Sequence, residues 1–189
     1  MTETTRRRVV AVIGDSKLDE PNDRKISIAR ECGRLLVDSG CRVMTGGMSG
    51  VMDAAMQGAR ASASYREGDT IGVLPSHDPL DAASSADIVL ATGLSLARNI
   101  IVANADGVIA VGGGAGTLSE IALAWQLRRP VVAVEAEGWS SRLGGVRLDS
   151  RKRTVNDEEN LVHAAKVPGD AVALLLQLLP RHTKRLRFV

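Results

Sequence analysis

The stretch VIAVGGGAGTLSE, residues 108–120, joins a short apolar run to a glycine-rich loop and then to a helical pattern. Glycines at four of the five positions 112–116 let backbone N–H groups approach an anion without obstruction by Cβ atoms. A helix that starts near Thr117 adds unpaired N–H groups and the positive end of its dipole. We therefore predict that this strand–loop–helix unit binds a phosphate group through Gly112, Gly113, Gly114, Ala115, Gly116 and Thr117.

Two familiar phosphate-binding motifs fit this loop poorly. A Walker A loop is excluded because no Gly-Lys-Ser/Thr follows the glycines. The dinucleotide fingerprint G-x-G-x-x-G has Thr117 in the place of its last glycine, and it normally follows the first strand of a fold rather than the fifth. Glu135 nevertheless stands where a ribose-binding acid would be expected, so the dinucleotide alternative stays open.

The alternation of apolar runs and helical patterns extends over the whole chain. Predicted strands cover residues 9–13, 41–45, 70–74, 88–91, 108–111 and 131–134. Predicted helices cover residues 26–36, 49–61, 95–105, 117–127 and 170–179. The strands are short and apolar on both faces, which is typical of a parallel sheet covered by helices on each side. The pattern predicts a doubly wound, mostly parallel, Rossmann-like α/β fold.

We expect residues 1–189 to form one domain, because no linker divides the chain. Its core is predicted at residues 8–137, and residues 138–168 are expected to form either an irregular insertion or edge strands, for which 145–149 and 161–162 are the candidates. A C-terminal helix is expected within 169–180. The basic residues near the two ends are interpreted as flexible, solvated tails: Arg6, Arg7, Arg8, Arg181, Lys184, Arg185 and Arg187.

Composition narrows the range of functions. The net charge of +2 comes from the tails, and the body between them is mildly acidic. With two Trp, one Tyr and one Phe, the chain offers little aromatic surface for stacking bases, so we do not expect a nucleic-acid partner. No apolar run approaches the ~20 residues that cross a membrane. Two cysteines do not suggest a disulfide framework, so we expect a cytoplasmic protein with free thiols.

Further site residues are expected in the other loops at the carboxyl ends of the strands, where open parallel sheets bind their ligands. We predict that the following residues contribute to phosphate or nucleotide binding: Gly14, Ser16, Gly46, Gly47, Gly50 and Asn99. The turn at residues 46–50 also has a simpler explanation as a tight turn with close helix packing. The three histidines are scattered, so no metal site is predicted.

Two charged residues are candidates for chemistry. Thr117 and Glu120 fit the capping box T-x-x-E, so Glu120 is interpreted either as a helix cap or as a catalytic carboxylate. An arginine at the position of Arg98 is usually a solvated surface charge. The loop after strand 108–111, however, places Arg98 within reach of an anion bound there.

With these motifs in view, the chain resembles the LOG-like Rossmann family, whose members are often called lysine decarboxylases and are related to the DprA/Smf Rossmann domain. The resemblance covers residues 9–134 and is carried by G-D-S at 14–16, G-G-M-S-G-V-M at 46–52, A-R-N at 97–99 and the loop at 112–120. It implies a phosphoribohydrolase that releases a base and ribose 5-phosphate from a nucleoside 5′-monophosphate. In this scheme Thr117 and the glycine loop hold the phosphate, Glu120 stabilises the oxocarbenium-like sugar, and Arg98 stabilises the departing base or the phosphate.

Two positions depart from the hydrolase hallmark, P-G-G-x-G-T-x-x-E with an Arg-Lys pair. Gly112 replaces the proline and Asn99 replaces the lysine. The segments A-R-N-I-I-V and V-G-G-G-A-G-T-L-S-E resemble those of the branch that contains molybdenum-cofactor carrier proteins, which bind a pterin phosphate without turning it over. The alternative to the hydrolase is therefore a non-catalytic carrier. A role in handling DNA, as in DprA, is disfavoured by the acidic body.

Neither function requires a resident cofactor, and the expected ligand is a phosphorylated small molecule, either a nucleotide or the molybdenum cofactor. The resemblance also implies a homo-oligomer, a dimer or tetramer. Ile100, Ile121 and Trp125 are candidates for its contacts or, alternatively, for the core.

Overall fold

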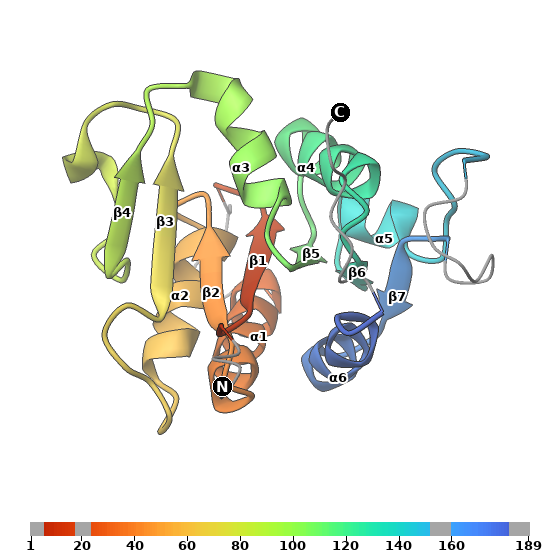
Figure 1. Ribbon diagram of the computed structural model, residues 1–189, viewed down its shortest axis with the longest axis horizontal. Helices are drawn as coiled ribbons and strands as arrows, with labels where there is room; N and C mark the ends of the chain where they lie inside the picture. Colours follow the sequence, from red (N-terminus) through yellow and green to blue (C-terminus); the bar gives the residue numbers. More distant parts are fainter. Residues whose placement is uncertain (1–5, 18–23, 152–159, 182–189) are drawn as a thin grey trace, which may run out of the picture.

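The computed structural model, which describes residues 6–17, 24–151 and 160–181, contains a seven-stranded parallel sheet (Figure 1). The strand order is β4-β3-β2-β1-β5-β6-β7. Their bounds are β1 Val9–Gly14, β2 Arg42–Thr45, β3 Thr70–Leu74, β4 Ile88–Ala91, β5 Gly107–Val111, β6 Val131–Val134 and β7 His163–Ala165. The chain winds outward from β1 to β4 and then returns to β5 beside β1, so the doubly wound α/β prediction is confirmed.

Helices cover both faces of the sheet. One face packs against α1 (Arg24–Asp38), α2 (Val51–Arg60) and α6 (Pro168–Leu178), and the other against α3 (Asn99–Ala103) and α4 (Ala115–Gln126). Strand β1 shows how the sequence does this: Val10 and Val12 enter the first core, whereas Ala11 and Ile13 enter the second. Alternating side chains on a strand point to opposite faces, and both faces here are buried.

The region after β6 differs from the prediction. No strand forms at residues 145–149, because only two backbone hydrogen bonds link Gly145 and Val146 to Val162. The edge strand lies slightly later than predicted, at β7, and a short helix α5 (Trp139–Leu143) comes before it. The helix predicted at 95–105 is divided into a 3-10 turn, η2 (Ser95–Arg98), and α3; another 3-10 turn, η1, spans Pro79–Asp81.

Two of the N-terminal arginines, Arg6 and Arg7, form ion pairs with the sheet, although the Arg6 side chain is still 56% exposed. Arg6 donates two hydrogen bonds to the carboxylate of Asp106, and Arg7 Nη1 lies 2.5 Å from Asp69 Oδ1. Both aspartates are buried just before strands β5 and β3. The interpretation of the basic ends as tails did not include these ion pairs of Arg6 and Arg7. Lys184, Arg185 and Arg187 lie outside the described residues.

Two further expectations concern the thiols and the membrane. Cys32 and Cys41 are both buried and free, as predicted. Within the described part of the chain, no helix has the length and apolar character to cross a membrane.

Candidate functional site

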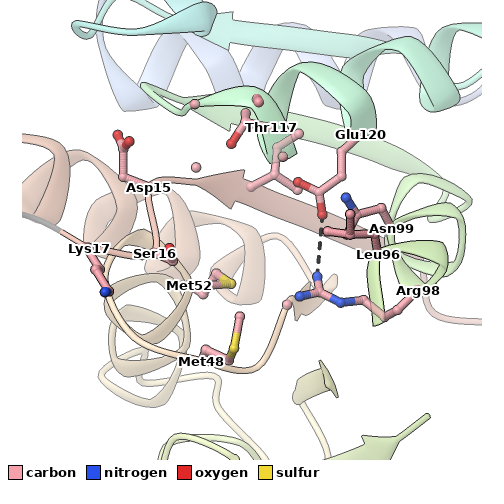
Figure 2. Close-up of a pocket in the computed structure, with 16 residues that line it drawn as sticks. Asp15, Ser16, Lys17, Met48, Met52, Leu96, Arg98, Asn99, Thr117 and Glu120 are labelled. Carbon is pink, nitrogen blue, oxygen red and sulfur yellow. Dashed lines mark ion pairs between the residues drawn. The ribbon is translucent and has the colours of Figure 1, made fainter. Parts of the chain in front are cut away.

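A hollow of about 460 Å³ lies at the carboxyl ends of β1 and β2, between the first turns of α2 and α4 and the η2 turn (Figure 2). Most of the predicted site residues line it: Gly14, Ser16, Gly46, Arg98, Asn99, Gly114, Ala115, Gly116, Thr117 and Glu120. Strand β1 lies between β2 and β5, where the strand order reverses, so the hollow sits where open α/β sheets bind their ligands.

The first two glycines of the loop, Gly112 and Gly113, lie outside this lining. Gly112 N–H donates to Ser140 Oγ at 2.8 Å, and Gly113 N–H donates to Asp15 Oδ2 at 2.9 Å. Both have positive φ, and a Cβ at Gly113 would stand 2.3 Å from Thr117 Oγ1. Their N–H groups are therefore used within the protein, and these glycines shape the loop instead of facing the hollow.

Gly47 and Gly50 also lie outside the lining. Gly50 has φ +69°, and a Cβ there would stand 2.3 Å from the carbonyl oxygen of Asp15. That oxygen accepts a hydrogen bond from Val51 N–H, and Ser49 Oγ donates to the carbonyl of Ser16. The tight turn thus ties the β1 and β2 loops together, and Gly46 and Met48 of the same turn line the hollow.

Helix α4 begins at Ala115, earlier than predicted, and Gly114 is its N-cap without a side-chain hydrogen bond. The N–H groups of the first turn have no intrahelical acceptors. A Cβ at Gly114 or Gly116 would meet nothing within 4 Å, so this helix end is open. Because Thr117 is already inside the helix, Glu120 lies too far along to cap it, and the capping-box interpretation is wrong.

Arg98 and Glu120 form a buried ion pair at one end of the hollow. Arg98 is 6% exposed and Glu120 is 7% exposed, with Nη1 and Oε1 3.6 Å apart. Figure 2 shows the two side chains pointing toward one another. Burial raises the pKa of the Glu120 carboxyl to about 7, although the charge of Arg98 acts in the opposite direction. Arg98 is therefore not the solvated surface charge that its position in the sequence suggested.

Asn99 holds two elements of the site together. Its Nδ2 donates to Ser119 Oγ at 2.9 Å, and Ser119 Oγ donates to the carbonyl of Gly116 at 2.7 Å. The side chain that replaces the hallmark lysine thus fastens the start of α3 to the first turn of α4.

Sequence reasoning missed several lining residues: Asp15, Lys17, Met48, Met52 and Leu96. Asp15 and Met48 stand in loops that were singled out, so their places were available from the sequence. Met52 lies on α2 at a spacing that is typical of a core residue. Asp15 also pairs with Lys25 at 3.1 Å. The described residues contain no group of His, Cys, Asp or Glu suited to a metal ion.

Comparison with known families decides the relationship. The SLOG cluster4 family matches residues 7–171. The chain belongs to this family. A curated relative, an uncharacterised protein of Archaeoglobus fulgidus, is 36% identical over 127 residues, which are 67% of this chain and 79% of the relative. The predicted LOG-like family membership is thereby confirmed.

Solved structures place this SLOG chain beside molybdenum cofactor carriers. The molybdenum cofactor binding protein of Rippkaea orientalis is 32% identical, with a TM-score of 0.76 over 93% of this chain and 99% of that one. The molybdenum cofactor carrier protein of Chlamydomonas reinhardtii is 33% identical, with a TM-score of 0.72 over the same shares. DprA of Helicobacter pylori is 19% identical, with a TM-score of 0.61 over 90% of this chain and 80% of that one, and shares the fold alone.

Proposed function

We propose that this SLOG protein is a non-catalytic carrier that binds the phosphorylated pterin of the molybdenum cofactor in the hollow between β1, α2 and α4. The observation that carries the proposal is the similarity to two cofactor-binding proteins along almost their entire length. The open N-terminus of α4 suits the phosphate, because its free N–H groups and dipole attract an anion. Lys17, which also lines the hollow, adds a positive charge.

The position of the hallmark lysine favours a carrier over a hydrolase. Asn99 stands there, carries no charge and is bonded to Ser119. The other charged pair of the hallmark is present, because Arg98 and Glu120 lie 3.6 Å apart. The site therefore lacks one of the two cations that the hydrolase hallmark implies.

Two measurements on the purified protein test this function together. Mass spectrometry of the released ligand is expected to find a pterin phosphate or its oxidation product. Incubation with a panel of nucleoside 5′-monophosphates is expected to release no free base. Base release that is lost in Glu120→Gln would contradict the carrier and restore the hydrolase.

We further propose that two copies associate through the apolar face beside η2. Ile88 and Leu90 on β4 are 41% and 42% exposed, and Leu96 and Ile100 are 79% and 47% exposed. The register with β3 places Ile88 and Leu90 on the sheet face that carries α3, and no described helix crosses in front of β3 and β4 in Figure 1. Exposed apolar patches commonly mark interfaces. Ile121 and Trp125 are buried in the core and cannot supply this contact.

Light scattering at micromolar concentration tests the association. Wild type is expected to be a dimer or larger, and the double change Leu90→Glu with Ile100→Glu is expected to give a monomer. Val167→Glu, at an exposed valine before α6, is the matched control and should leave the mass unchanged. A monomeric wild type would refute the association.

A further inference from the structure

The hollow offers two separate groups to a ligand, the first turn of α4 and the guanidinium of Arg98. Glu120 lies five residues after Ala115 on α4, so its Cα stands about 7–8 Å farther along the helix axis, although its side chain leans back toward the helix start. The guanidinium of Arg98 lies beside Glu120. A phosphate on the first-turn N–H groups contacts its partners at ~3 Å and leaves Arg98 to another part of the ligand.

Arg98 has hydrogen-bond donors to offer this second group. Among the described residues, none accepts a hydrogen bond from its guanidinium, and its nearest anion, Glu120, is 3.6 Å away. A Cβ at Gly46 would stand 2.6 Å from Nη1 and 3.1 Å from Nη2. Glycine at this position therefore lets the buried guanidinium pack against the loop backbone while Arg98 still lines the hollow. Arginine carries donors only, so its partner must be an acceptor.

The walls beside Arg98 suit a flat ring. Met48 and Met52 line the hollow together with Leu96, and Figure 2 shows the two sulfur-bearing side chains on the same side of the guanidinium. Thioether sulfur makes favourable contacts with aromatic rings. A volume of about 460 Å³ is in the range of small-molecule sites and leaves room for a ring beyond the phosphate.

We infer that the site selects a phosphorylated heteroaromatic ring whose edge presents two adjacent acceptors to Arg98, and that it disfavours 6-aminopurines. An oxidised pterin, such as the 6-hydroxymethyl compound, presents such a pair at O4 and N5, and a 6-oxopurine presents it at O6 and N7, the edge that arginine binds in a bidentate manner. Adenine pairs an acceptor with an N–H donor, which would face a guanidinium donor. The inference rests on the proposed phosphate site and specifies which ring accompanies the phosphate.

Calorimetric titration of the full chain tests the selection with four probes: 6-hydroxymethylpterin phosphate, GMP, AMP and ribose 5-phosphate. The pterin phosphate, GMP or both are expected to bind at least about tenfold more tightly than AMP. The two together separate a pterin ligand from a purine ligand. Ribose 5-phosphate, which lacks a ring, reports on the phosphate end alone. Equal or tighter binding of AMP than of both oxo compounds would overturn the inference.

Substitutions assign the selection to its residues. Arg98→Lys keeps the positive charge but loses the paired N–H donors of the guanidinium. The ratio of the affinity for the oxo compounds to the affinity for AMP should therefore fall close to one, while the affinity for ribose 5-phosphate should not change. Met48→Ala should weaken every ring-bearing probe several-fold and spare ribose 5-phosphate. Arg30→Lys and Met44→Ala, away from the hollow, are the matched controls. A preference unchanged in Arg98→Lys would refute the role of Arg98. If ribose 5-phosphate and every other probe fail to bind wild type, the proposed phosphate site itself fails.

Discussion

Gly46→Ala is expected to disturb ligand binding far more than folding. The added Cβ would stand 2.5 Å from Met52 Sδ and 2.6 Å from Arg98 Nη1, closer than such atoms approach. Both neighbours are the far ends of flexible side chains, so the protein relieves the overlap by moving them. Overpacking of a core costs about 1–3 kcal/mol, and this adjustment should cost about 1 kcal/mol, at the lower end of that range.

The same movement displaces Arg98 from the ligand edge and fills the ring space beside Met52. We expect the affinity for the pterin phosphate to fall at least about tenfold, because hydrogen bonds to a charged group contribute about 1.5–3 kcal/mol. Thermal unfolding and calorimetric titration, measured together, separate the two effects. Gly169→Ala adds a Cβ in open space on α6 and should leave affinity unchanged. Unaltered affinity in Gly46→Ala would show that the space over Gly46 is not used by the ligand.

Three further predictions concern stability. Burial raises the pKa of Glu120 in the folded state to about 7, above its ordinary value of 4.5, so the folded state binds the proton more tightly than the unfolded state. The stability of wild type relative to Glu120→Gln should therefore fall as the pH rises from about 4.5 to about 7. A difference in unfolding free energy that does not change with pH, measured by denaturant titration, would contradict the raised pKa. Asp106→Ala leaves Val9 N–H and Arg6 without their acceptor and should lower the free energy of unfolding by about 2–4 kcal/mol, whereas the exposed control Asp81→Ala should lower it by less than about 1 kcal/mol. Gly33→Ala would place a Cβ 1.9 Å from the carbonyl oxygen of Ala55 where α1 crosses α2, so it should cost more than about 2 kcal/mol in chemical denaturation, and a neutral effect would refute this close packing.

Much of the fold was predictable because its signals are local. Val10 and Val12 on one face of β1, and Ala11 and Ile13 on the other, give a strand that is apolar on both sides, and this occurs only where helices cover both faces. The region 138–168 lacked such a signal. Its short helix α5 is fixed instead by contacts with the glycine loop, such as Trp139 N–H to the carbonyl of Gly113.

The site was predictable at the level of loops but not of individual contacts. Gly112, Gly113, Gly114 and Gly116 stand in one glycine-rich loop, and the sequence does not distinguish them. In the structure, however, the N–H groups of Gly112 and Gly113 donate hydrogen bonds to Ser140 and Asp15. Only the folded arrangement brings those acceptors to the loop. The capping box misled because α4 starts at Ala115, before the threonine that the motif takes as its cap. The ion pair of Arg6 and Asp106 joins residues a hundred positions apart, so no local sequence pattern could predict it.

A crystal structure with 6-hydroxymethylpterin phosphate bound would show whether the start of α4 holds the phosphate of a pterin ligand. We expect phosphate oxygens within hydrogen-bond distance of the N–H groups of Ala115, Gly116 and Thr117, with the ring beside Met48 and its O4 and N5 edge on Arg98. A phosphate bound elsewhere, with the first turn of α4 closed by side chains, would contradict it.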